Sequence, residues 1–230
     1  MSFDHYTDSY RDAVEESIAF AGGDAARYVG AKARMLVELA GRRIGAPDGL
    51  HALDVGCGPG ETDAFLEGRF GSLSGVDLSS GMVARAASRN PWASYSSYGP
   101  GEPLPYEEAS FDLSFAICVL HHVPPVERAA FVEEMRRVTR PGGLVAIFEH
   151  NPLNPLTRKA VRGCPFDEDA VLLSRGEARR RLADAGLAEV EAPYIVFFPR
   201  EGDLRSRLER RLGWLPLGAQ YYVAGSRDDA

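Results

Sequence analysis

Short apolar segments alternate along the chain with segments in which apolar residues recur about every 3.6 positions. A short apolar run that ends at glycine or polar residues is typical of a buried strand, whereas the 3.6-residue period is typical of an amphipathic helix. The apolar runs predict seven strands, at residues 50–55, 73–77, 94–98, 111–117, 144–149, 189–198 and 219–225. Because helical segments separate most of them, we expect an α/β fold with a doubly wound, mainly parallel sheet.

The segments with helical period predict helices at residues 61–68, 79–88, 125–139 and 174–185. The first 44 residues are expected to form two helices that break at Gly22-Gly23, and Pro141-Gly142-Gly143 is expected to form a turn. Leu204, Leu208 and Leu212 form a further apolar stripe with arginines around it. This pattern is typical of a helix with one solvated face, and docking to an anionic or lipid-like surface is the alternative.

An irregular connection, residues 151–173, follows the predicted strand at 144–149 and contains three prolines. Open α/β sheets bind ligands beyond the carboxyl ends of their strands, which is where this connection begins. We therefore expect it to cover a ligand site, with a merely packed loop as the alternative.

Composition and charge restrict the classes of protein that fit. The 230 residues are enough for one sizeable domain, and the formal net charge of −7 disfavours nucleic acid as a partner. The amino terminus lacks a secretory pattern, and no apolar run approaches the roughly 20 residues of a membrane span, so we expect a cytoplasmic protein. Cys57, Cys118 and Cys164 form no CxxC pair, and we expect no metal.

A glycine-rich turn follows the first predicted strand, with Gly56, Gly58 and Gly60 in a G-x-G-x-G spacing. Glycine lets a ligand approach the main chain closely, and this spacing is one residue tighter than the G-x-G-x-x-G of dinucleotide-binding proteins. Asp77 ends the next strand, where an acidic side chain would reach the hydroxyls of an adenosine ribose. The alternative is that Asp77 caps the following helix, which Ser79 or Ser80 could do equally well.

Five motifs occur in a familiar order, and the chain resembles the class I S-adenosylmethionine-dependent methyltransferases of the small-molecule type. The motifs lie at residues 53–61, 75–82, 104–112, 119–123 and 140–143, so the resemblance covers about residues 45–150. It implies a Rossmann-like, seven-stranded sheet with helices on both faces and an antiparallel last strand. It also implies one domain over residues 1–230, with an N-terminal helical lid (1–45), a cofactor-binding core (46–150), and acceptor-site insertions with the C-terminal half of the sheet (151–217).

The resemblance implies S-adenosylmethionine as the cofactor. Asp54 and the glycine loop would hold its methionine part and sulfonium side, and Asp77 would accept both ribose hydroxyls. Leu78 and Met82 would pack on the faces of the adenine, and Gly101 and Glu102 would lie along its edge. The remaining cofactor contacts would come from Cys57 in the glycine loop and from Ile117 and Cys118 at the end of the fourth strand. Many relatives carry Gly-Asp-Ala where this chain has Gly99-Pro100-Gly101, and Pro100 cannot bond the adenine amine.

Histidines follow two of the predicted central strands, where an acceptor would meet the cofactor. His122 and His150 are the candidate catalytic bases, because histidine titrates in the useful range; the alternative is that they are structural hydrogen-bonding groups. His121, Asn151 and Arg158 are candidate acceptor contacts, although Arg158 also fits a solvated charge cluster. Tyr6, Tyr10 and Tyr28 are candidate lid residues, with helix packing as an equal alternative.

These residues predict methyl transfer to oxygen or nitrogen of a small-molecule acceptor by in-line displacement, in which positioning dominates and a histidine can serve as base. A protein or RNA methyltransferase is the first alternative. A catalytically inactive S-adenosylmethionine-binding subunit and a nicotinamide oxidoreductase are the others. We expect a monomer or homodimer without nucleic acid, transmembrane segment or peripheral lipid contact.

Overall fold

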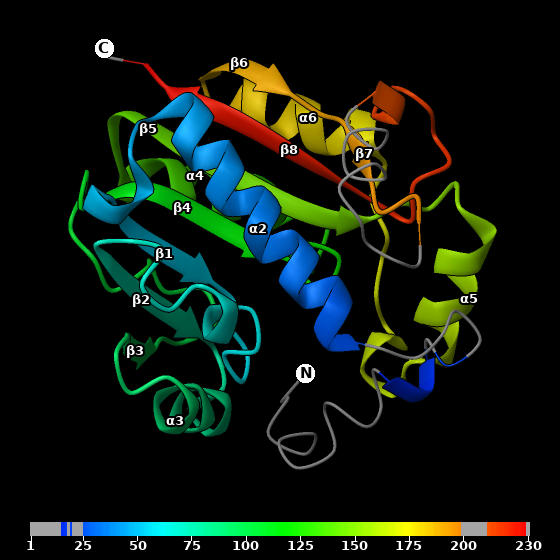
Figure 1. Cartoon of the computed structure of the whole chain (residues 1–230), viewed down its shortest axis with the longest axis horizontal. Coiled ribbons are helices and arrows are strands. Elements are labelled where there is room, and N and C mark those ends of the chain that lie inside the picture. The colour runs from blue at the N-terminus through cyan, green and yellow to red at the C-terminus, as the bar shows by residue number, and fades with distance from the viewer. Residues whose placement is uncertain (1–14, 18, 20–24, 199–210, 229–230) are drawn as a thin grey trace.

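The computed structural model describes residues 15–17, 19, 25–198 and 211–228. These residues form one mixed sheet in the order β3-β2-β1-β4-β5-β8-β6, with β7 also paired to β8 (Figure 1). The strands are β1 (His51–Val55), β2 (Ser72–Asp77), β3 (Ser94–Ser97), β4 (Phe111–Ile117), β5 (Thr139–His150), β6 (Leu187–Glu191), β7 (Tyr194–Ile195) and β8 (Gln220–Arg227).

Strands β1 to β5 are parallel, and β8 runs antiparallel to its neighbours β5, β6 and β7. The carboxyl ends of β1, β2, β4 and β5 therefore meet at one edge of the sheet. This topology confirms the expected Rossmann-like, mainly parallel sheet with an antiparallel last strand.

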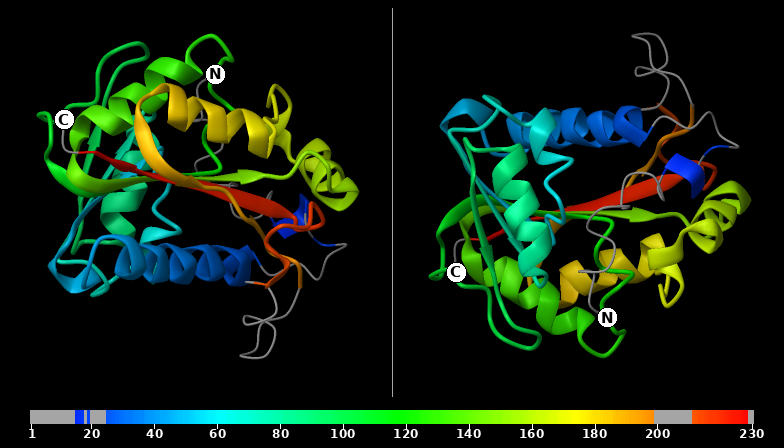
Figure 2. Two further views of the ribbon diagram at one scale, coloured as in Figure 1. Left: turned by 90° about the horizontal axis from the view of Figure 1, so that it is seen from above. Right: turned by 90° about the horizontal axis from the view of Figure 1, so that it is seen from below.

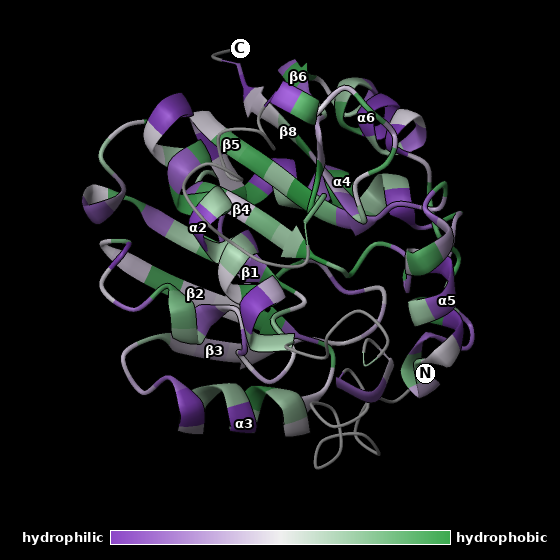
Figure 3. Cartoon of the chain, turned by 45° about the vertical axis from the view of Figure 1, so that its right-hand side comes forward, coloured by the Kyte–Doolittle hydropathy of each residue, from purple (hydrophilic) through white to green (hydrophobic). Residues whose placement is uncertain are grey.

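Helices cover both faces of the sheet, as expected (Figure 2). Helix α2 (Ala25–Arg43) lies on one face, α4 (Arg128–Val138) and α6 (Arg175–Asp184) lie on the other, and α3 (Ser80–Arg89) packs on β2 and β3. Hydrophobic residues concentrate in the central strands β4 and β5, whereas hydrophilic residues mark the outer sides of the helices (Figure 3). The strands between the two helical layers contribute fully buried side chains to both cores, such as Leu53 to one and Phe115 to the other.

Two strand predictions differ from the structure by more than the one or two residues found at the ends of most others. The single strand expected at 189–198 is divided into β6 and β7, because Pro193 cannot donate a ladder hydrogen bond and the pairing with β8 shifts register between Ala188 and Glu191. The turn expected at residues 141–143 lies inside β5 instead. There the chain bulges, with Gly142 at a φ of +74°, before regular pairing resumes at Leu144.

One predicted helix does not form, and one helix that forms is not predicted. Residues 61–68 form only a short 3-10 turn, η4 (Asp63–Phe65), because Gly60 and Gly68 both adopt positive φ and leave too little chain between them for a helix. Conversely, the connection after β5 contains an unpredicted helix, α5 (Pro155–Gly163), followed by the 3-10 turn η5 (Pro165–Asp167). The Asn154 side chain caps α5 by accepting hydrogen bonds from the amides of Leu156 and Thr157.

Several expectations concern residues that the structure does not describe. The break at Gly22-Gly23, Tyr6, Tyr10 and most of the leucine stripe at 204–212 lie outside the described residues. Among the helices that are described, none is long and apolar enough to cross a bilayer.

Candidate active site

A large cavity opens at the carboxyl ends of β1, β2, β4 and β5. Its volume is about 1690 Å³, and its lining includes the glycine loop, Asp77, the three histidines at the ends of β4 and β5, and parts of α2 and α5. A site for one drug-sized ligand measures about 300–1,000 Å³. The cavity is therefore large enough to hold a nucleoside cofactor and a small second ligand together.

The glycine loop between β1 and η4 is built by left-handed backbone. Gly56, Gly58 and Gly60 have φ values of +81°, +51° and +69°. A Cβ at Gly56 would lie 2.6 Å from the Val119 side chain, and one at Gly60 would lie 2.5 Å from Nδ2 of Asn90. Gly58 has open space beside it, and Gly56 and Gly58 line the cavity whereas Gly60 does not. We conclude that Gly60 serves the packing of the loop on α3, and that Gly58 provides the close approach for a ligand.

Asp77 joins the glycine loop to the end of β2. Its Oδ2 accepts a hydrogen bond of 2.9 Å from the amide of Gly58, and its Oδ1 accepts one of 2.9 Å from the amide of Ser79. The cap of α3 is Ser79, whose Oγ accepts from the amide of Met82 at 3.1 Å, so capping is not the role of Asp77. Each carboxylate oxygen has two lone pairs, so Asp77 can also accept hydrogen bonds from a ligand in the cavity.

Asp54 and Asp63 form a buried carboxyl pair beneath the loop. Asp54 is 3% exposed and Asp63 is 0% exposed, and burial together with the nearby Asp63 charge raises the pKa of Asp54 well above its usual range. Burial also raises the pKa of Asp63 to about 6, although a hydrogen bond of 2.8 Å from the hydroxyl of Tyr95 opposes the shift. Such a pair shares a proton rather than carrying two charges.

The residues present fit S-adenosylmethionine. Oδ1 of Asp54 is buried without a hydrogen-bond partner among the described residues, and Asp54 lines the cavity. An ammonium group such as that of a methionine moiety would supply both the missing donor and a compensating positive charge. Together with Asp77 and the open space at Gly58, this gives a site for an aminoacyl group at one point and a ribose at another.

The candidate adenine contacts lie along the same cavity. Met82 is 2% exposed and Leu78 is 50% exposed, and both line the cavity with Gly101 and Glu102. The carboxylate of Glu102 accepts a hydrogen bond of 2.9 Å from the amide of Gly99, so it is fixed next to Pro100. This carboxylate, or a main-chain carbonyl, is a candidate acceptor for the adenine amine, because the Pro100 side chain has none.

The end of β4 turns sharply at Cys118, whose φ is +58°. Ile117 and Cys118 line the cavity, and the Lys32 ammonium lies 3.6 Å from the Cys118 sulfur. Burial alone would raise the pKa of Cys118, but Lys32 and His150 outweigh it and lower the pKa to about 7. Cys57 also lines the cavity, and burial with the nearby carboxylates raises its pKa, so its thiol stays protonated.

His121 is held between two carboxylates. Its Nδ1 lies 2.7 Å from Oε2 of Glu149, and its Nε2 lies 3.4 Å from Oδ1 of Asp167. Burial by itself would lower the pKa of His121, but Glu149 and Asp167 raise it to about 10. His121 is therefore an imidazolium at neutral pH.

His122 and His150 flank His121 in the cavity. The ring centroid of His121 is 4.1 Å from that of His122 and 5.0 Å from that of His150. Burial and the positive charge of His121 lower the pKa of His122 to about 4, so His122 is neutral at pH 7. Nδ1 of His150 lies 3.4 Å from the amide nitrogen of Gln220. All three histidines line the cavity, as the sequence led us to expect.

The other candidate acceptor contacts are placed less favourably. Asn151 is 1% exposed and does not line the cavity. Its side-chain amide donates to the carbonyls of Pro216 and Gly218 and so stabilises the loop before β8. Arg158 is exposed on α5 and also lies outside the lining. Tyr28 lines the cavity from α2 and packs partly against the core.

Three charged residues that the sequence did not single out belong to the site: Lys32, Glu149 and Asp167. Glu149 directly precedes His150 at the end of β5, so its position was available from the strand prediction. Asp167 and Lys32 come from η5 and α2, and no spacing rule connects either segment to the histidines. Their placement depends on tertiary packing.

The doubly wound sheet, with its glycine loop, acidic residue and open cavity, is typical of a nucleoside-cofactor-binding α/β protein. Residues 53–147 match the methyltransferase domain family. An uncharacterized methyltransferase of Synechocystis is 33% identical over 107 residues, which are 46% of this chain and 50% of that protein. The malonyl-[acyl-carrier protein] O-methyltransferase of Dechloromonas aromatica is 33% identical over 148 residues, which are 61% of this chain and 53% of that protein.

A solved structure extends the similarity of fold beyond the matched region. The S-adenosylmethionine-dependent methyltransferase of Thermotoga maritima, described as a possible histamine N-methyltransferase, superposes with a TM-score of 0.68 at 19% identity and covers 98% of both chains. Over residues 53–147 the chain is similar to the methyltransferase domain family, and its fold is similar to that of an S-adenosylmethionine-dependent methyltransferase. The chain spans about half the length of the curated relatives described above.

Proposed function

We propose that this protein transfers a methyl group to oxygen or nitrogen of a small-molecule acceptor. The observation that carries the proposal is that one cavity contains both Asp54, Asp77 and the open glycine loop and the cluster of three histidines. A shared cavity lets a bound acceptor face a bound cofactor without intervening water, and positioning supplies most of the rate enhancement in an in-line displacement.

The histidines provide the proton chemistry that such a transfer needs. When bound, S-adenosylmethionine supplies a methyl group on a positively charged sulfur. An acceptor hydroxyl or ammonium must lose a proton before or during the transfer, and the ring of His122 is neutral and lines the cavity. His150 lies in the same cluster and is the second candidate base. The imidazolium of His121 cannot accept a proton, and both of its ring nitrogens face carboxylates, so its role is to hold Glu149 and Asp167 beside the other two histidines.

A curated relative with a named acceptor supports transfer to a small or carrier-bound molecule. The malonyl-[acyl-carrier protein] O-methyltransferase is named for transfer to oxygen, which is one of the two acceptor atoms proposed for this chain. The formal net charge of −7 also favours a small molecule over a nucleic acid.

Binding and turnover test the proposal separately. Calorimetric titration with S-adenosylmethionine and with NADH should show binding of the first alone; tight binding of NADH alone would overturn the cofactor assignment. A radiolabelled methyl-transfer screen over phenols, carboxylic acids and amines should then find an acceptor. His122→Ala and His150→Ala should each lower turnover while leaving cofactor affinity within about twofold, and unchanged turnover in both would remove the histidine base.

A further inference from the structure

We propose that His121, His150 and Asp167 form a binding site for a first-row divalent transition-metal ion at the acceptor end of the cavity. One donor atom from each side chain lies within 4.8 Å of the other two. The three residues come from separate segments, the loop after β4, the end of β5 and the turn η5, so the fold itself brings them together. The sequence alone predicts no metal, because these residues have no recognisable spacing along the chain.

The distances suit coordination better than direct hydrogen bonding. Nε2 of His121 lies 3.4 Å from Oδ1 of Asp167. Two ligands of one tetrahedral ion at metal distances of about 2.1 Å are separated by about 3.4 Å. A strong charged hydrogen bond between nitrogen and oxygen would instead measure about 2.8 Å. His121 and Asp167 are therefore already spaced as two ligands, and a small movement of His150 would complete the set.

Neighbouring groups orient the candidate ligands from behind. Oε2 of Glu149 lies 2.7 Å from Nδ1 of His121, and Glu149 is 0% exposed. A carboxylate that accepts a hydrogen bond from one imidazole nitrogen, leaving the other to bind a metal, is a recurring feature of metal sites. The amide nitrogen of Gln220 lies 3.4 Å from Nδ1 of His150 and can donate to it, which positions the second ring; the Nε2 proton of His150 would then have to leave that nitrogen when a metal binds to it.

The ligand types determine which ions fit. Two imidazoles and one carboxylate suit zinc, iron, cobalt or nickel, whereas magnesium prefers oxygen ligands alone. All three side chains line the cavity, so a bound ion would keep coordination positions open toward it. The acceptor class that fits such an ion carries an oxygen beside the atom to be methylated. The metal site itself rests on geometry alone. Only the binding of an acceptor by the metal ion rests on the proposed function.

The competing occupant of the cluster is a proton. The two carboxylates of Glu149 and Asp167 hold His121 as an imidazolium. The proton on this ring therefore balances part of the negative charge that a metal ion would otherwise balance. The two occupants differ in one measurable respect, because a protonated His121 needs no divalent ion and gives no saturable metal binding.

Zinc titration of the tag-free, chelator-treated full-length protein distinguishes these occupants without cofactor or acceptor. Calorimetry should show one zinc ion bound per chain, with thermal stabilisation by zinc and none by magnesium at the same concentration. Asp167→Asn and His150→Ala should each weaken zinc binding at least 30-fold. His51→Ala is the matched control, because His51 is exposed at the start of β1 on the opposite edge of the sheet, and it should bind zinc as the wild type does.

Two results would overturn the site. One is the absence of saturable zinc binding, and the other is binding that both site variants retain, which would show adventitious zinc on other side chains. Circular dichroism of each variant establishes that it is folded, and the use of two independent variants keeps the test decisive if one of them fails to fold. Neither result depends on methyl transfer, so the failure of the metal site and that of the proposed function are distinguishable.

Discussion

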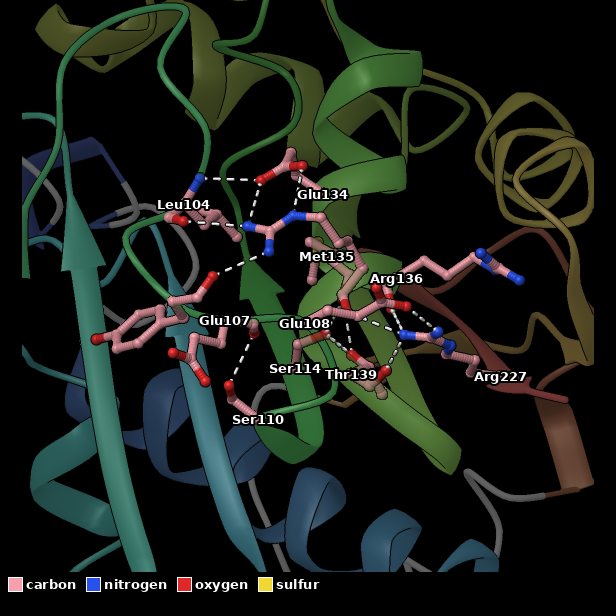
Figure 4. A network of polar contacts seen from close by, with 12 residues as sticks. Leu104, Glu107, Glu108, Ser110, Ser114, Glu134, Met135, Arg136, Thr139 and Arg227 are labelled. Atoms are coloured by element: carbon pink, nitrogen blue, oxygen red, sulfur yellow. Dashed lines mark hydrogen bonds and ion pairs between the residues drawn. The ribbon is translucent and has the colours of Figure 1, made fainter. Parts of the chain in front are cut away.

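The two edges of the sheet differ in whether their key polar groups find hydrogen-bond partners within the protein. At the amino ends of β4 and β5, Arg227 closes the end of α4: its Nη1 donates to the carbonyls of Arg136, Arg137 and Thr139 at 3.2, 2.9 and 2.8 Å (Figure 4). The last carbonyls of a helix have no partner within the helix, and a guanidinium also interacts favourably with the helix dipole. The hydroxyl of Thr139 donates to the Met135 carbonyl at 2.7 Å, so side chains of the protein itself satisfy these carbonyls at the end of α4.

The cavity edge instead keeps groups that the chain alone does not satisfy. Asp54 and Asp63 are buried together, and each has a carboxylate oxygen without a hydrogen-bond partner among the described residues. Cys118 adopts a left-handed φ of +58° that costs a non-glycine residue free energy. The comparison teaches that one edge stabilises the fold, whereas the other holds Asp54, which lines the cavity and whose missing partner a ligand can supply. Substitutions at the two edges should therefore separate stability from binding.

The largest effect is expected for Asp77→Ala at the cavity edge. The substitution removes the acceptor of the two charge-assisted hydrogen bonds that we propose for a ribose, each worth about 1.5–3 kcal/mol, so affinity for S-adenosylmethionine should fall at least about 100-fold. Calorimetric titration measures the change. Asp184→Ala, an exposed position at the end of α6, is the control and should bind normally. Affinity of Asp77→Ala within threefold of the wild type would show that Asp77 holds only the loop.

The second-largest effect, a loss of stability, is expected for Arg227→Ala at the opposite edge. The side chain is 11% exposed, and its loss leaves the carbonyls at the end of α4 without their guanidinium donor. The free energy of unfolding should fall by about 2–3 kcal/mol and the Tm by about 5–10 °C. Affinity for S-adenosylmethionine should be unchanged in the folded variant. A variant with normal Tm and weakened cofactor binding would contradict the separation of the two edges.

The sequence predicted the framework of the fold because the strands leave strong local patterns. The predicted bounds of β4 match the structure, and Ser79 and Ser174 cap α3 and α6 where the helical periods begin. Helix α5 was missed although Asn154-Pro155 carries a clear start pattern, an asparagine cap followed by proline in the first turn. The prolines of this connection do not prevent the helix, because Pro155 occupies its first turn, where a backbone N–H is not needed.

The candidate site was predictable only in part, and for a physical reason. The glycine loop, Asp77 and the histidines follow strands, and the carboxyl ends of parallel strands share one edge. Asp63 and Asp167 belong to 3-10 turns, whose side-chain directions depend on tertiary packing. Consequently the sequence located the histidines but did not reveal that two carboxylates make His121 a cation.

A smaller effect is expected for Asp63→Asn, which tests whether the carboxyl pair costs stability. The pKa of Asp63 is raised to about 6 in the folded protein, above its value in the unfolded chain. The folded state therefore binds more protons between about pH 4 and 6, and this group makes the protein more stable as pH falls through 6. Above pH 6 the buried Asp63 carboxylate is charged, which lowers the stability of the folded state. A neutral amide at this position avoids that cost, so the variant should be more stable than the wild type at pH 7.5 by about 1–2 kcal/mol.

Urea unfolding at pH 5 and pH 7.5 measures this difference. The gain of Asp63→Asn should shrink at pH 5, where the wild type already holds the proton. Tyr95→Phe is the control, because it removes the hydroxyl that donates to Asp63 at 2.8 Å but keeps the carboxyl pair. An equal change in stability at both pH values would show that the shared proton has no part in the effect.

The smallest effect is expected for Glu108→Gln, which separates charge from helix capping in the Arg227 cluster. Oε1 of Glu108 lies 2.5 Å from Nη2 of Arg227, but its side chain is 63% exposed, and exposed ion pairs contribute little to stability because water and salt screen them. The Tm of Glu108→Gln should stay within about 2 °C of the wild type at about 0.15 M salt, since the carbonyl contacts of Arg227 remain. A Glu108→Gln variant that lowered the Tm as much as Arg227→Ala would show that Arg227 stabilises the fold through its ion pair with Glu108 and not through the carbonyls at the end of α4. The contrast between the two edges would then rest on charge alone.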